Sequence, residues 1–106
     1  MNLNQSNVMA GKGTQTFTIG TAGVYKMSCR STEIPPSGLT ITLSQSGSVT
    51  ASYSYTILSP LQNNLSGENI FLCAVGDVLT CALTSSNTID NLVSNIKSVI
   101  TLNPGN

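Results

Sequence analysis

The fold is decided by residues 70–83, which read IFLCAV, then GD, then VLTCAL. Two apolar runs of strand length, separated by a tight turn that begins with glycine, indicate two buried β-strands. Side chains alternate along a strand, so Ile70 and Leu72 share one face while Phe71 and Cys73 share the other. Because both faces are apolar, we expect an opposing sheet, a partner subunit or both to cover the face that a single core leaves exposed.

The rest of the chain carries further strand patterns. Residues 15–19 and 24–30 alternate between apolar and polar side chains, and the double proline at residues 35–36 marks a surface loop. Residues 39–58 predict a hairpin, because apolar side chains alternate with serines and threonines on both sides of a turn at residues 46–48. The count of strands predicts an all-β, two-sheet antiparallel jelly-roll sandwich of about eight short strands. The hydroxyl-rich face of the hairpin is typical of a solvent-facing sheet, and a sugar-binding surface is the alternative.

The two ends of the chain each allow two interpretations. Residues 1–14 are polar and form either an N-terminal arm or an edge strand, ahead of a jelly-roll domain at residues 15–106. Residues 89–102 fit both a helical stripe and a strand. β-branched side chains and an otherwise all-β chain favour a final strand there.

The composition argues against several classes of function. Only 8% of the residues are charged and the formal net charge is zero, whereas a globular domain averages about 25% charged residues. We therefore expect neither nucleic acid nor a membrane surface as a partner. There is no histidine, so the commonest general base and transition-metal ligand is missing. The four acidic residues fit turns and loops without a shared site, and we predict no cofactor, no metal and no catalytic residue.

The three cysteines, Cys29, Cys73 and Cys81, lie within apolar strand patterns and form no CxxC pair. This placement favours buried reduced thiols over a disulfide, in keeping with synthesis in a reducing cytoplasm. The first residues carry neither the basic nor the apolar region of a secretory signal, and no apolar run reaches transmembrane length.

Segments of the chain resemble the jelly rolls of the tumour necrosis factor and complement-head family. Residues 17–19 (FTI) followed by 22–25 (AGVY) resemble its strand, Gly-x-Tyr, strand signature, and residues 75–78 (VGDV) resemble its Gly-Asp corner. The resemblance covers residues 17–102. It implies two packed sheets, strands of opposite sheets at the Gly-Asp corner, and a homotrimer that joins through the inner sheet. The candidates for that inner sheet or the trimer interface are Tyr25, Phe71, Val75 and Ile96.

Residues 85–91 (SSNTIDN) and 95–98 (NIKS) are similar to the endings of small virion proteins of tailed bacteriophages that adopt the same trimeric jelly roll. The resemblance implies a non-enzymatic decoration (cement) protein that binds the outer capsid surface and stabilises the shell by bridging capsomers of the major capsid protein. Such a protein is made in the host cytoplasm and resides in the virion. In these proteins an N-terminal arm commonly contacts the shell, and the expected contact residues here are Asn2, Leu3, Val8, Met9 and Lys12.

A second interpretation belongs to a different class of protein. Trimeric jelly rolls commonly sit at fibre tips, so the chain is also compatible with a receptor- or glycan-binding head domain of a phage fibre or adhesin. Its partner would then be a glycan or a protein receptor. A coiled-coil or repetitive shaft would favour this interpretation, and the sequence contains none.

Overall fold

The computed structural model describes residues 5–10, 13–31, 38–57, 65–85 and 97–104. These described ranges contain eight β-strands and no helix that could cross a bilayer. The strands are β1 (Gln5–Ala10), β2 (Gly13–Thr18), β3 (Gly23–Ser31), β4 (Leu39–Ser46), β5 (Ala51–Thr56), β6 (Ser66–Cys73), β7 (Val78–Ser85) and β8 (Lys97–Pro104).

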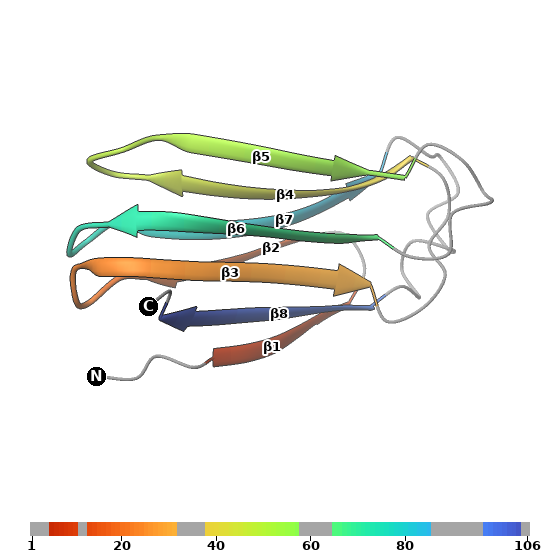
Figure 1. Cartoon of the computed structure of the whole chain (residues 1–106). Helices are drawn as coiled ribbons and strands as arrows, with labels where there is room; N and C mark the ends of the chain where they lie inside the picture. The colour runs from red at the N-terminus through yellow and green to blue at the C-terminus, as the bar shows by residue number, and fades with distance from the viewer. Residues whose placement is uncertain (1–4, 11–12, 32–37, 58–64, 86–96, 105–106) are drawn as a thin grey trace.

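The strands form two four-stranded sheets that pack against each other (Figure 1). Sheet A has the order β1-β8-β3-β6 and sheet B has the order β2-β7-β4-β5, with every neighbouring pair antiparallel. Among the described strands, β4 and β5 are the one pair that is adjacent both in the chain and in a sheet. Connections that pass repeatedly between two sheets are those of a jelly roll, so the predicted fold class is confirmed.

The core lies between the sheets, and in β3 and β4 it follows the two-residue period of a strand, because alternate side chains point inward. Complete burial of such an apolar side chain contributes roughly 1.5–3 kcal/mol. All three cysteines are buried free thiols, as predicted. The largest fully buried side chains are Ile19, Met27, Leu39, Ile41, Leu43, Ile57, Phe71, Leu79, Leu83, Ile100 and Leu102.

The Gly-Asp segment is a corner between the sheets, as the family resemblance implies. β6 belongs to sheet A and β7 to sheet B, and Gly76 between them has a φ of 93°, a conformation that favours glycine. Phe71 points into the core, whereas Ile70 and Leu72 are 60% and 70% exposed. One apolar face of β6 is therefore left uncovered within the single chain.

Both ends of the described chain lie in sheet A. β1 pairs with β8 over all six of its residues, so of the two interpretations of the N-terminal segment the structure contains an edge strand. β8 pairs with β3 on its other side, and the expected final strand is therefore present. The first part of the ambiguous tail, residues 89–96, lies outside the described residues.

β4 and β5 form the predicted hairpin, and its outer face carries paired hydroxyls. The hydroxyl oxygens of Thr40 and Thr56 are 2.9 Å apart, and those of Thr42 and Ser54 are 3.2 Å apart. Cross-strand pairs of this kind contribute about 0.2–1 kcal/mol each. The apolar side of the hairpin is only partly buried, since Val49, which precedes β5, is 50% exposed and Tyr53 within β5 is 41% exposed.

Candidate interaction surface

The outward face of β6 and the corner that follows carry the most exposed large apolar side chains of the described residues. Ile70 and Leu72 lie on β6, and Val75, which is 66% exposed, lies in the corner two residues after the strand ends. In the register between β3 and β6, Leu72 lies opposite Val24, which is half-buried. We call Val24, Ile70, Leu72 and Val75 the apolar patch. Single exposed apolar residues are ordinary, but a group of them on one face marks a surface that contacts a partner.

An ion pair borders the apolar patch on the same face of sheet A. The Lys26 ammonium nitrogen lies 3.2 Å from a carboxylate oxygen of Glu68, and Lys26 is paired with Ile70 in the register. Both charged side chains are about half exposed, so the pair adds only about 0–1 kcal/mol to stability. Its larger effect is on the surface charge, because the two groups neutralise each other beside the patch.

The predicted interface residues fall in two different environments. Tyr25 and Phe71 lie on sheet A, but their side chains point into the core and are 5% and 2% exposed. The Tyr25 hydroxyl donates a hydrogen bond to the Thr21 carbonyl oxygen at 2.6 Å. Of the two predicted alternatives, inner sheet or trimer interface, these two side chains support sheet A from inside and do not reach its outer face. Val75 is exposed in the corner, and Ile96 lies outside the described residues.

Ile70 and Leu72 were not among the predicted interface residues. The signal that identifies them was nevertheless present, because the alternation of residues 70–75 places them opposite Phe71. In the folded chain Phe71 belongs to the core, so Ile70 and Leu72 are left on the outer face of β6.

The predicted capsid-contact residues are described only in part. Val8 and Met9 belong to β1, where their main chains lie opposite Val99 and Ser98 of β8. Asn2, Leu3 and Lys12 lie outside the described residues. The described part of the N-terminal segment is therefore an integral strand of sheet A.

Asp77 is buried at the corner, and hydrogen bonds occupy its carboxylate. Its oxygens accept from the main-chain N–H of Ala74 at 2.9 Å, from that of Ser48 at 3.1 Å, and from the Gln45 side-chain amide at 3.2 Å. These donors hold the pKa of Asp77 below its usual value, the Ala74 N–H most strongly, and they outweigh the opposing effect of desolvation. Asp77 therefore ties the β4–β5 turn to the β6–β7 corner, and structural hydrogen bonds engage both of its carboxylate oxygens.

The buried thiols are held in their neutral form. Burial, and secondarily the nearby charge of Asp77, raises the pKa of Cys73. A hydrogen bond with Cys29, together with burial, raises the pKa of Cys81. Since the thiolate is the nucleophile and the metal ligand, neither group is activated. The described residues also contain no group of three metal-binding side chains.

Comparison with known proteins supports the fold. No protein-family model and no curated protein sequence matches the chain. Among solved structures, the chain is similar to the globular domain of a complement 1qA protein from zebrafish, with 17% sequence identity and a TM-score of 0.65. The match covers 86% of this chain and 69% of that one. The fold is therefore the complement and tumour necrosis factor type of jelly roll.

Proposed function

We propose that the protein is a non-enzymatic, homotrimeric decoration protein that binds the outer surface of a phage capsid and bridges neighbouring capsomers. The observation that carries the proposal is the apolar patch on sheet A, which no part of the described chain covers. Asp77 is occupied by structural hydrogen bonds, and the sequence has no histidine. Both observations favour a structural role over a catalytic one.

Association with further copies of the same chain would cover the apolar patch without a different partner. Ile70, Leu72 and Val75 each expose well over half of their surface, so covering them would contribute about 1–2 kcal/mol per side chain. A closed ring of identical chains buries the same surface on every subunit. The formal charge of the chain is zero, and an apolar contact between neutral chains depends little on salt.

The decoration role rests on the similarity of the C-terminal segments to small virion proteins and on the fold. Binding to the assembled shell stabilises it by mass action, because shell opening must also break the bridge between capsomers. The proposed capsid contacts are Asn2, Leu3, Val8, Met9 and Lys12. This role places the protein in the virion, with the major capsid protein as its partner.

The first experiment is the solution mass of the protein, measured by light scattering at low and high salt. We expect a mass of three chains that salt does not change. Leu72→Asp should shift the mass toward the monomer, because it would place a charge within the contact. The matched control is Ser52→Asp, which introduces the same charge on exposed β5 of sheet B. A wild-type monomer would rule out the trimer.

A second experiment tests the capsid contact. Co-sedimentation with tailed-phage capsids that lack their own decoration protein should recover the wild-type chain with the shells. Removal of Met1–Asn4 should reduce this binding while the trimer persists, because it leaves β1 in place. Removal of residues 1–12 is unsuitable, since it would also delete the edge strand that pairs with β8. Capsid binding by the shortened trimer at wild-type strength would exclude the arm as the contact.

A receptor- or glycan-binding head domain is the second candidate. It is favoured by the similarity to a complement globular domain and by the paired hydroxyls on the outer face of the hairpin. A glycan array probed with the labelled trimer distinguishes the two functions. Selective glycan binding without capsid binding would favour the head domain, and capsid binding without glycan binding would favour the decoration protein.

A further inference from the structure

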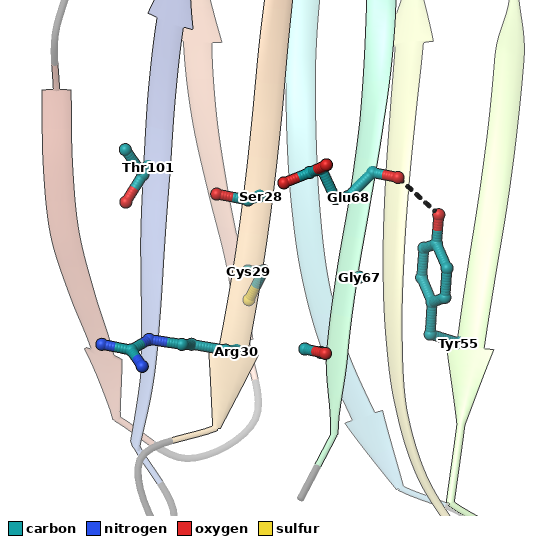
Figure 2. A pocket seen from close by; sticks show the side chains of 8 residues that line it. Ser28, Cys29, Arg30, Tyr55, Gly67, Glu68 and Thr101 are labelled. Atoms are coloured by element: carbon teal, nitrogen blue, oxygen red, sulfur yellow. Dashed lines mark hydrogen bonds between the residues drawn. The ribbon is translucent and has the colours of Figure 1, made fainter.

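A polar hollow of about 380 Å³ lies on sheet A next to the Lys26–Glu68 ion pair, and Tyr55 of sheet B also lines it. Its lining includes the hydroxyl-bearing Ser28 and Ser66, with Thr101 on the β8 side and the charged residues Arg30 and Glu68 (Figure 2). These small side chains leave open space between the two charged ones. The proposed function does not use this hollow.

The register of the strands brings these side chains together. Ser28 of β3 lies opposite Glu68 of β6 on one side and opposite Thr101 of β8 on the other, and Arg30 lies opposite Ser66 in the next outward-facing row. Figure 2 shows Arg30 extending across β8 and the Glu68 carboxylate extending toward Ser28. One chain therefore supplies the whole lining.

The lining of the hollow contains one cation, Arg30, and one carboxylate, that of Glu68. Of the described acids, Glu68 pairs with Lys26 and Asp77 is engaged at the corner. Arg30 is exposed and forms no ion pair with either of these carboxylates. A guanidinium presents five N–H donors in a fork that matches an oxyanion, and the hydroxyls of Ser28 and Ser66 can donate to the same ligand.

We propose that this hollow binds a small oxyanion, such as phosphate or a carboxylate, through Arg30, Ser28 and Ser66. The proposed trimer strengthens the case, because burying Arg30 in a sheet A interface is unfavourable unless a negative group accompanies it. The site itself lies within one chain, so binding and trimer formation can fail separately.

The test is a titration of the isotope-labelled native protein with phosphate at constant ionic strength, followed by NMR. We expect saturable shifts of the Arg30 side-chain N–H signal and of the amides of Ser28 and Ser66. Arg30→Gln should weaken binding at least about tenfold, since it removes a charge-assisted hydrogen bond. Arg30→Lys keeps the positive charge but loses the forked arrangement of N–H donors, so its affinity for phosphate should lie between those of the wild type and Arg30→Gln. Glu68→Gln should tighten binding, because it removes a negative charge from the lining.

The ligand series identifies the source of the oxyanion. Tighter binding of phosphate than of acetate or glucuronate assigns the site to a phosphate group, whereas tighter binding of glucuronate than of acetate or glucose assigns it to an acidic sugar. Shifts that do not saturate, or that persist unchanged in Arg30→Gln, would overturn the proposal. Light scattering on the same samples reports whether the trimer is present, so loss of the trimer is not mistaken for loss of the site.

Discussion

The phenol of Tyr55 donates a hydrogen bond to the main-chain carbonyl oxygen of Glu68 at 2.9 Å. Tyr55 lies on β5 of sheet B and Glu68 on β6 of sheet A, and both are edge strands. The Asn69 side-chain amide donates to the same phenol oxygen, and the Tyr53 ring meets the Phe71 ring edge-on with centroids 5.8 Å apart. Two tyrosines therefore close one open side of the sandwich.

Removal of the phenol hydroxyl should loosen this side without affecting the core. Tyr55→Phe leaves the carbonyl of Glu68 and the amide of Asn69 without this partner, and we expect a loss of about 0.5–1.5 kcal/mol in the free energy of unfolding. Urea denaturation measures the loss, and amide hydrogen exchange should increase in β5 and β6 first. An unchanged unfolding midpoint would show that water replaces the phenol fully.

Gly67 should not tolerate a side chain. A Cβ at this position would lie within 3.0 Å of three ring atoms of Tyr55, so Gly67→Ala must displace the ring or strain β6. We expect a loss of about 1–3 kcal/mol by urea denaturation. Gly13→Ala is the matched control, because Gly13 is also in a strand and a Cβ there meets nothing within 4 Å. Equal effects of the two substitutions would contradict the clash.

A second substitution identifies the cause of the Gly67→Ala effect. If the clash with the ring is responsible, Gly67→Ala should cost much less in a Tyr55→Ser background than in the wild type. The two residues would then show the non-additivity expected of contacting neighbours. Strict additivity would instead place the effect in the main chain of β6.

Acid should destabilise the protein through Asp77. Because hydrogen bonds lower its pKa in the folded chain, the contribution of this group to stability is present above its unfolded pKa and is lost as the pH falls from about 4 toward the folded value. The thermal midpoint should therefore fall in this pH range. Asp77→Asn should lower the midpoint at neutral pH and flatten the acid dependence. An acid dependence as steep in Asp77→Asn as in the wild type would assign it to other carboxyls.

The three thiols should resist modification in the folded protein. Cys29 and Cys81 are at most 1% exposed and Cys73 is 4% exposed, and burial raises the pKa of both Cys73 and Cys81. A thiol-specific chromogenic disulfide should therefore react slowly in native buffer and release three equivalents after denaturation. Cys73 should react first. Rapid reaction of all three native thiols would mean that the sandwich opens readily.

The strands themselves could be predicted because their pattern is local. The alternation of residues 24–30, for example, correctly places Tyr25, Met27 and Cys29 on the buried face of β3. At residues 70–75 the same rule failed to distinguish core from surface, because both faces are apolar and only the position of β6 in sheet A decides between them. The sequence therefore left Phe71 open between the inner sheet and the trimer interface, whereas the fold buries Phe71 and exposes Leu72.

The corner and the polar hollow depend on contacts between distant segments. Gln45 is 3% exposed, and its side-chain amide donates to Asp77, which is 32 positions away in the chain. The hollow likewise requires β3 to lie between β6 and β8 in a fixed register. Neither arrangement could be predicted from neighbouring residues in the sequence, since serine, glutamine and arginine within an alternating strand are typical of solvent-facing positions.

The pairing of β1 with β8 has a consequence for synthesis on the ribosome. β8 is hydrogen-bonded to both β1 and β3, so sheet A has no complete central region until β8 has left the exit tunnel. Until then the nascent chain holds β1 and β3 with an unpaired edge, a state prone to wrong association. Sheet A can therefore close only after β8 has been made, because β8 joins β1, the first of the described strands, to β3.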